Sequence, residues 1–182
     1  MSKKVLVLSG PSGAGIGAVV SALFARRSDL TAVTPVTARK MKDGEKDGVG
    51  FYFYDLEGWN ALKEAGDLLE TTEFAGNDYG TSRRLVRAAL DQGKHVLLNL
   101  EVRRAGQVKK NLPEAVCVYL EPSPDVLRER YAALSRSAFE LNVRLETAER
   151  ERESASFCDE RVNSDDTEAA VRALEEILDR AE

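Results

Sequence analysis

The sequence predicts an α/β fold built on a parallel core sheet, and three observations support that prediction. Residues 5–9, 95–100 and 115–120 are short and strongly apolar. Strands covered on both faces of a parallel sheet have this composition. Helical patterns alternate with these strands along the chain, and a glycine-rich turn separates the first strand from the first helix. Together they predict a parallel sheet flanked by helices.

The helices follow from apolar residues that recur at helical spacing between polar ones. After the glycine turn, the predicted helices span residues 17–27, 83–93, 105–112, 123–134, 140–155 and 167–182. Gly93 lies where the second of them should end, since glycine readily follows the last helical turn. Each core strand is thereby followed by a helix that can return the chain to the start of the next strand.

Residues 31–81 interrupt this alternation, because they are rich in threonine, tyrosine, phenylalanine and glycine turns. Their pattern predicts a small, partly antiparallel insert with one helix around residues 59–65, and Trp59 is expected in its core. The first part of this segment, "TPVTARK", is expected at the end of the second strand of the core.

Composition limits the class of protein. A chain of 182 residues is one domain by length and buries enough surface to fold without a disulfide or a metal. Its net charge of −5 argues against a nucleic-acid partner. Cys117 and Cys158 form no CxxC pair and are expected as reduced thiols in or near the core. Without a signal peptide or a long apolar run, the chain is expected to be cytoplasmic and to have no membrane partner.

The turn after the first strand, "GPSGAGIG", has the spacing of a phosphate-binding loop. That pattern requires Gly, four residues, Gly, Lys and then Ser or Thr. Gly10 and Gly15 occupy the two glycine positions, but Ile16 replaces the lysine and Gly17 replaces the hydroxyl residue. Main-chain N–H groups and the helix dipole could still create an anion site here.

Two other interpretations of the loop remain open at this point. Residues 13–18, "GAGIGA", satisfy the GxGxxG/A pattern of a dinucleotide site. That site also needs an acidic residue about 20 positions later, whereas residues 34–40 are basic. An ordinary strand–helix turn is the third interpretation.

The chain resembles guanylate kinase along nearly its whole length, in five segments that follow the family's order. "LSGPSGAG" resembles its phosphate loop, and "TARKMKDGEKDGVGFYF" (37–53) resembles its GMP-phosphate segment. "LLETTEFAGNDYGTS" (68–82), "LLNLEVRRAG" (97–106) and "RVNSDD" (161–166) resemble three further family motifs. Several independent motifs in order are far more specific than any one of them.

The resemblance implies a single domain over residues 1–182, with a parallel sheet of the phosphate-loop type. Its core would be residues 1–33 and 82–182, its mixed insert for GMP residues 34–81, and its short lid about residues 132–140. The reaction of the family is phosphoryl transfer from ATP to GMP, which gives ADP and GDP.

The resemblance also implies a set of site residues. The ATP phosphates and purine would meet Gly10, Ser12, Gly13, Ala14, Gly15, Ile16, Gly17 and Asn163. GMP would meet Arg39, Lys42, Glu45, Phe51, Glu70, Tyr79, Thr81 and Glu101. The expected catalytic residues are Arg39, Arg144 and Arg136.

The chemistry of the insert agrees with those roles. Arg39, Lys42 and Tyr79 could converge on a dianionic phosphate, the arginine through its bidentate fork. Glu70, with Thr81, would read the guanine edge by accepting from the N1–H and the N2 amine, which adenine lacks. A buried carboxylate matched to these donors rejects other bases, because its polar atoms would stay unpaired.

Several positions depart from the family pattern. Beyond the loop, Pro35 takes a small polar position beside the guanine pocket, Lys42 replaces an arginine and Phe51 replaces a tyrosine. Asn99 and Glu101 stand where the family has aspartates.

The segment that follows the predicted strand at residues 95–100 also differs from the family, and so does the lid. Arg103 and Arg104 replace a Gln–Gly pair. Two alternatives stay open for them: one of the two turns toward the phosphates, or both face solvent. In the lid, Ala133 lies nearest the position of the first family arginine, and Arg136 is expected to reach inward instead.

These departures predict a nucleotide-binding protein whose phosphoryl transfer is strongly impaired. No side-chain metal site is expected, and Mg²⁺ would arrive with ATP if the chain is active. GMP or another guanine nucleotide would bind, and ATP more weakly. Two alternatives stay open: a non-catalytic module that binds a guanine nucleotide or a phosphorylated or acidic protein segment, and a kinase for another phosphorylated small molecule.

Overall fold

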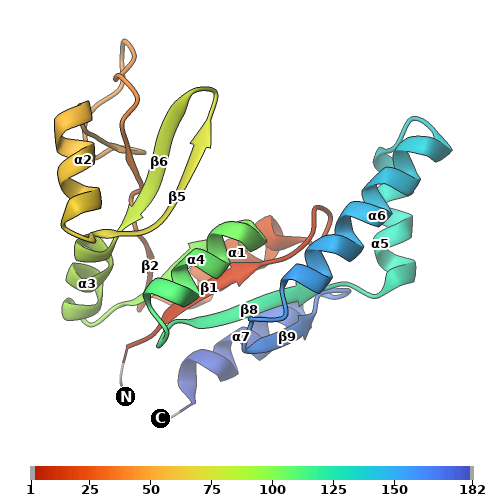
Figure 1. The fold of residues 1–182 in the computed structure, drawn as a ribbon. Helices are drawn as coiled ribbons and strands as arrows, with labels where there is room; N and C mark the ends of the chain where they lie inside the picture. The colour runs from red at the N-terminus through yellow and green to blue at the C-terminus, as the bar shows by residue number, and fades with distance from the viewer. Residues whose placement is uncertain (1–2, 181–182) are drawn as a thin grey trace.

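A five-stranded parallel sheet forms the core, in the order β2–β7–β1–β8–β9. The computed structural model describes residues 3–180 (Figure 1). The core strands are β1 (Val5–Ser9), β2 (Leu30–Ala32), β7 (His95–Asn99), β8 (Val116–Glu121) and β9 (Glu160–Asn163). All residues of β1 are buried, as expected of the central strand of a sheet covered on both faces.

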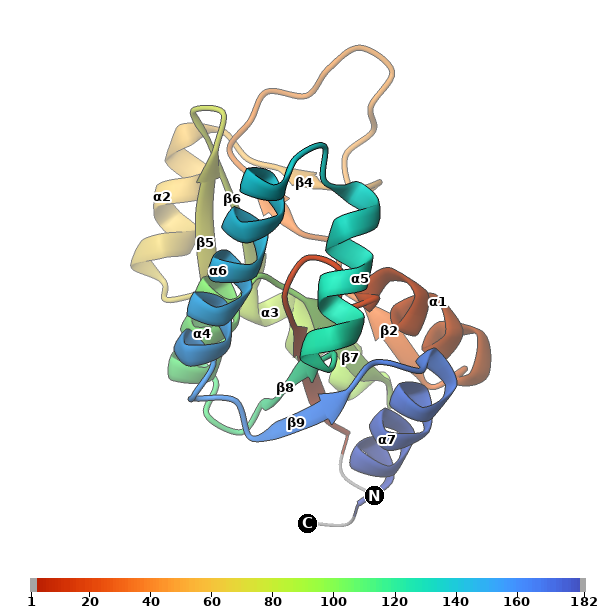
Figure 2. The same cartoon turned by 90° about the vertical axis from the view of Figure 1, so that its right-hand side faces the viewer.

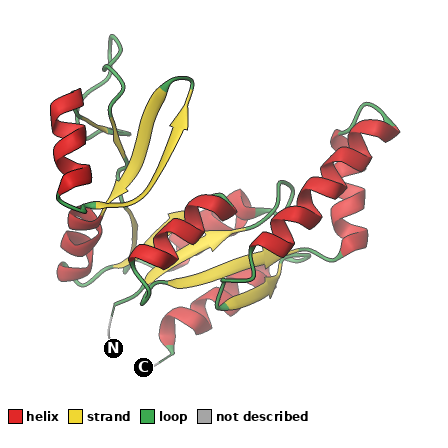
Figure 3. Cartoon of the chain, viewed as in Figure 1, coloured by secondary structure: helices red, strands yellow, loops and turns green. Residues whose placement is uncertain are grey.

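Side chains that alternate along β1 point into two separate cores. Leu6 and Leu8 pack with α1 (Ile16–Arg26) and α7 (Thr167–Asp179) on one face of the sheet. Val5 and Val7 pack with α3 (Arg83–Asp91) and α4 (Val102–Asn111) on the other face. The expected α/β fold with helices on both faces of a parallel sheet is therefore confirmed (Figure 3).

A second, four-stranded sheet stands beside the core, in the order β4–β3–β6–β5. Its elements are β3 (Val36–Thr37), β4 (Tyr52–Phe53), α2 (Leu56–Glu64), β5 (Leu68–Phe74) and β6 (Asn77–Ser82). The β3–β4 pair is parallel and the other pairs are antiparallel, so the sheet is mixed. Trp59 of α2 is fully buried against this sheet, as the sequence predicts.

The helices α5 (Pro124–Leu134) and α6 (Ala138–Ser154) form a hairpin that projects from the core (Figure 2). Pro124 starts α5 in the first helical turn, where its missing N–H costs nothing. Within residues 3–180, no helix has both the length and the apolar character that crossing a membrane would require.

One expectation about the strands is wrong, and one core strand has no counterpart among the predicted strands. The segment "TPVTARK" does not end the second core strand: β2 ends at Ala32, and β3 belongs to the second sheet. The core also contains β9, for which no apolar run is visible in the sequence. The reason is that β9 is an edge strand in which only Val162 is buried. The last two residues of the helix predicted over 167–182 lie outside the described residues.

The two cysteines lie next to each other, with 2.6 Å between the Sγ atoms of Cys117 and Cys158. Both are free in the structure. The hydrogen bond with Cys158 and burial raise the pKa of Cys117, so its thiol keeps its proton at neutral pH.

His95 lies at the start of β7, where its Nδ1 accepts a hydrogen bond from the Lys4 N–H at 3.1 Å. Burial, and then the charge of Lys3, lower the pKa of His95 below its usual 6.5. As the pH falls below 6.5, the unfolded chain therefore takes up a proton that the folded chain resists. We expect the free energy of unfolding to decrease from pH 7.5 to pH 5.5 in urea titrations. The variant His95→Gln should lose part of this decrease, and an unchanged slope would contradict the assignment.

Candidate functional site

The loop between β1 and α1 has the backbone of an anion site. Gly13 and Gly15 adopt positive φ angles of 83° and 78°, which side-chain-bearing residues seldom adopt. A Cβ on Gly10 would lie 2.8 Å from the Leu120 carbonyl oxygen, so this position also needs glycine. Gly15 caps α1 without a side-chain hydrogen bond. The N–H groups of the first helical turn therefore have no side-chain partner there and can bind an anion.

Neither residue that replaces the family's lysine and hydroxyl can contribute a polar side chain. Ile16 is half-buried and packs against the apolar core beneath α1. Gly17 is exposed, and a Cβ built on it would meet no atom within 4 Å. The loop therefore offers main-chain N–H groups, with neither the lysine nor the hydroxyl of the family pattern.

Arg130 of α5 supplies a positive charge beside the loop, although it is not among the site residues predicted from the sequence. Its Nη1 donates to the Gly13 carbonyl at 2.8 Å, and its Nη2 donates to the carbonyls of Ser164 and Asp165 at 3.1 and 3.0 Å. The only signal in the sequence is its position three residues after Leu127, on the helix face that is buried. Arg130 joins the loop to the segment that contains Asn163.

We expect Arg130→Met to lower the free energy of unfolding by about 1–3 kcal/mol, because three carbonyl groups lose a charged donor. It should also weaken the binding of tripolyphosphate by about 10-fold, since the loop loses its neighbouring cation. Urea titration and calorimetry measure the two effects.

Arg128→Met is the matched control, because Arg128 lies on the same helix but is exposed. If the two variants behave alike, Arg130 has no special role at the loop.

A second cluster lies in the insert around Arg39. Its guanidinium donates to both oxygens of Glu45, at 2.8 and 3.0 Å. It also lies over the rings of Phe53 and Phe51, with its Cζ 5.2 and 5.7 Å from the ring centroids. The Phe51 and Tyr79 rings are 5.6 Å apart. The structure thus brings together four of the residues expected to bind GMP, namely Arg39, Glu45, Phe51 and Tyr79.

Glu45 orders this segment through three hydrogen bonds, two of them from Arg39. Besides Arg39, it accepts from the Lys42 N–H at 2.6 Å. The hydrogen bond from Arg39, and then the one from Lys42, lower the pKa of Glu45 to about 2, so the ion pair is intact at neutral pH. The Lys42 side chain is exposed beside the cluster.

The third cluster lies where β5 faces α4. Glu70 is buried, and its Oε1 accepts from the Thr81 hydroxyl at 2.7 Å. The Arg104 guanidinium donates to the same carboxylate, from Nε to Oε2 at 2.6 Å and from Nη2 to Oε1 at 2.9 Å. Arg104 therefore neither faces solvent nor turns toward the phosphates, and both expectations for it are wrong.

Glu101 and Arg103 lie on another side of α4. They line a cavity between α4 and α6 that also contains Glu151. Burial, and then the negative charge of Glu101, raise the pKa of Glu151. In the described part of the chain, neither Glu101 nor Arg103 forms a hydrogen bond with Glu70 or with the loop.

Arg136 of the expected lid and Arg144 of the helix after it do not reach the loop in this structure. The Arg144 guanidinium donates to Glu140 one turn earlier, at 2.9 Å. Arg136 is exposed, and its main-chain N–H donates to Glu140 at 2.9 Å. The expectation that Arg136 reaches inward is therefore wrong here.

Asn163 lies near the loop. Its Oδ1 accepts from the Asp165 N–H at 3.0 Å, next to the carbonyls that bind Arg130.

The residues around the loop do not fit a protein-bound magnesium ion. Gly17 provides no hydroxyl, and Asn99 provides an amide where the resemblance implies an aspartate. In residues 3–180, no group of three histidine, cysteine, aspartate or glutamate side chains could hold a metal. Magnesium prefers oxygen ligands such as carboxylates, in octahedral geometry. A magnesium ion at this loop would depend on ligands other than these side chains.

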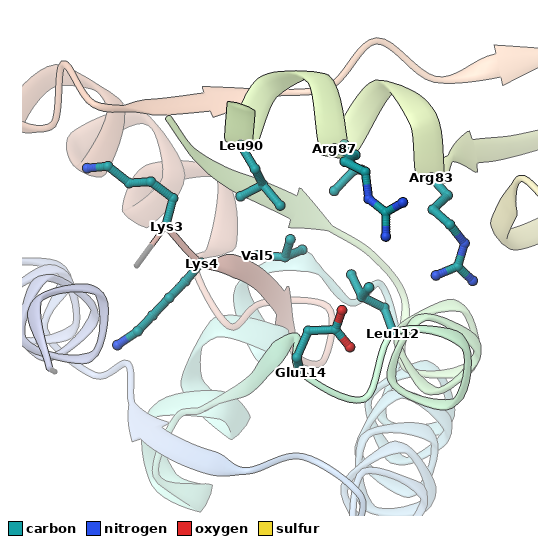
Figure 4. A pocket seen from close by; sticks show the side chains of 9 residues that line it. Lys3, Lys4, Val5, Arg83, Arg87, Leu90, Leu112 and Glu114 are labelled. Carbon is teal, nitrogen blue, oxygen red and sulfur yellow. The ribbon is translucent and has the colours of Figure 1, made fainter. Parts of the chain in front are cut away.

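A small cavity of about 120 Å³ lies at the other end of β1 (Figure 4). Its walls include Lys3, Lys4, Arg87 and Glu114. Lys4 turns away to donate to the Ile177 carbonyl at 2.9 Å. This cavity contains none of the residues expected in the site, and it lies at the strand end opposite the glycine loop.

Comparisons with known proteins find similarity along nearly the whole chain. A family model described as guanylate kinase matches residues 2–181. The guanylate kinase of Enterococcus faecalis is 38% identical over 178 residues, which cover 96% of this chain and 87% of the relative. That of Synechococcus sp. (strain CC9311) is 39% identical over 171 residues, covering 93% and 90%. The crystal structure of guanylate kinase from Anaplasma phagocytophilum matches with a TM-score of 0.65 and 25% identity, over 97% of this chain and 85% of that one.

Proposed function

Because the chain belongs to the guanylate kinase family, we propose that it is a guanylate-kinase-like nucleotide-binding protein with strongly impaired phosphoryl transfer from ATP to GMP. One observation carries the proposal. The loop keeps the glycine backbone of an anion site, while Ile16 packs into the core and Gly17 presents no side chain. The scaffold for binding phosphates is retained, but groups that neutralise charge during transfer are missing.

The donor phosphates would be held by the loop N–H groups, with Arg130 as the neighbouring cation. The acceptor phosphate would lie at the cluster of Arg39, Phe51 and Tyr79, with Lys42 at its edge. The loop would orient the donor phosphates, and the cluster around Arg39 would orient the acceptor phosphate. Such positioning is a large part of phosphoryl-transfer catalysis. ATP would bind weakly, because Ile16 replaces the lysine whose ammonium group would contact its phosphates.

The expected loss of rate follows from the missing donors. Removal of one preorganised donor to the transition state typically costs about 10²–10³ in rate. The lysine and the hydroxyl act on the same phosphates, so their losses do not simply add. A combined loss of about 10⁴-fold or more is the expected order of magnitude. Since the side chains present do not fit magnesium, no step of this proposal depends on a protein-bound metal.

Calorimetric titrations with GMP and with ATP, followed by a coupled assay of ADP release, test the proposal. We expect binding of both nucleotides and turnover about 10⁴-fold below that of the Enterococcus faecalis guanylate kinase assayed alongside. Turnover within about 10-fold of that enzyme would overturn the impairment. If neither GMP nor ATP binds, the proposal of a nucleotide site is overturned.

A second candidate is a non-catalytic module that binds a phosphorylated or acidic protein segment in the same cleft. The observation that favours it is that the basic cluster around Arg39 is ordered by Glu45 although the transfer groups are missing. Phe139 and Leu134 on the α5–α6 hairpin are also 79% and 60% exposed, which gives a partner apolar surface. Binding of a phosphopeptide without binding of either nucleotide would support this candidate over the first.

A further inference from the structure

The carboxylate of Glu70 already accepts three hydrogen bonds from groups of the protein itself. Arg104 fills one oxygen through Nε and the other through Nη2, at 2.6 and 2.9 Å. The Thr81 hydroxyl adds a third hydrogen bond, at 2.7 Å. The Glu70 side chain is 0% exposed and that of Arg104 is 22% exposed, so the pair is sheltered from water. No side of the carboxylate stays open for a two-pronged donor.

Guanine would approach Glu70 with the same pattern of donors. Its N1–H and N2 amine form two parallel N–H groups on one edge, as the Nε–H and Nη2–H of a guanidinium do. The carboxylate can accept such a fork from one partner at a time. Pro35, which takes a polar position of the family beside this pocket, has no side-chain donor or acceptor to offer a base instead.

We infer that Arg104 acts as an internal substitute for guanine at Glu70, so that the acceptor site binds phosphomonoesters without selecting a guanine base. The inference rests on the proposed function, in which Glu70 faces the base of the acceptor. It goes beyond that function because it names the residue that removes the selectivity of the family and the wider class of ligand that results.

The packing of α4 on β5 holds Arg104 in this position. Gln107, one turn later on α4, accepts from the Thr71 N–H at 2.9 Å and donates to the Thr71 carbonyl at 3.0 Å. Asn111, a further turn along, donates to the Leu69 carbonyl at 2.9 Å. Arg104, Gln107 and Asn111 therefore share the helix face that lies along β5. The contact of Arg104 with Glu70 is part of a docked surface rather than an isolated surface ion pair.

Calorimetric titrations with GMP, AMP and ribose 5-phosphate test the inference in the wild type and in Arg104→Gly. We expect the wild type to bind GMP and AMP with dissociation constants within about 3-fold of each other, because neither base reaches Glu70. Arg104→Gly should tighten GMP binding by about 10-fold or more and leave AMP and ribose 5-phosphate nearly unchanged. Adding Glu70→Gln to that variant should abolish the gain, because an amide cannot accept from both donors.

Arg103→Gly is the matched control, because Arg103 is a neighbouring arginine on the same helix that forms no hydrogen bond with Glu70. The selectivity of this variant for GMP over AMP should equal that of the wild type. Arg104→Gln serves if the glycine variant does not fold, and it should shift selectivity toward GMP in the same direction. A wild type that prefers GMP over AMP by about 10-fold or more overturns the inference and leaves the proposed function standing. Unchanged selectivity in both Arg104 variants also overturns it. Absence of binding by all three ligands in every folded variant overturns the proposed function and the inference together.

Discussion

Ile16→Lys combined with Gly17→Ser is expected to raise ATP affinity by about 10-fold to 100-fold, because the loop gains a charged donor and a hydroxyl for the phosphates. The structure has room for both changes. A Cβ at Gly17 meets no atom within 4 Å. The aliphatic stem of a lysine can cover the apolar surface that Ile16 covers now, while its ammonium group reaches the loop. ADP release in the presence of GMP should rise by about 10²-fold or more.

Calorimetry with ATP and a coupled ADP assay measure this gain. Ala18→Lys is the control, because Ala18 is exposed in the same turn of α1 and receives the same charge without replacing Ile16. If the control gains as much ATP affinity, the effect is general electrostatic attraction. If the double variant gains none, the loop is not the cause of weak ATP binding, and the cause lies in the α5–α6 hairpin instead.

Arg104→Met is expected to lower the free energy of unfolding by about 3–5 kcal/mol, because it leaves the buried Glu70 carboxylate without its charged partner. Thr81 still donates one hydrogen bond, which does not neutralise the charge. Glu70→Gln in the same chain should recover most of the loss, since the uncompensated charge is gone. Replacing both residues by apolar ones of similar size should cost little or even stabilise the fold.

Urea titrations of the two single variants and the double variant form a mutant cycle that measures the coupling of Arg104 and Glu70. GMP should stabilise Arg104→Met more than the wild type, because a ligand that binds only the folded state raises stability according to its affinity. A coupling energy near zero would show that the close contact contributes nothing, and would place this pair with ordinary surface ion pairs.

The parts of this molecule that could be predicted from sequence are those with a local signal. The strands β1, β7 and β8 are apolar because both faces of the sheet are covered. The glycine loop has fixed spacing because its backbone needs positive φ angles at Gly13 and Gly15. The insert showed its glycine turns and its buried Trp59.

Contacts between distant segments could not be predicted in this way. Arg130 lies 117 residues from Gly13, and only the fold brings the two together. Arg104 and Glu70 are 34 residues apart on different elements, so neither residue shows locally that its charge is already paired. The edge strand β9 buries one side chain only, and so it has no apolar run. For Arg104, the direction of the side chain from α4 decides the contact, and that direction follows from the packing of α4 on β5 rather than from composition.

The hydrogen bonds from Gln107 and Asn111 to β5 have a mechanical consequence. They fasten a core helix to the outer strand of the second sheet. A hinge movement of that sheet must either carry α4 along or break these bonds together with the Arg104–Glu70 pair. The fastening also shields the free edge of β5 from pairing with strands of other molecules, so it protects the chain against edge-to-edge aggregation.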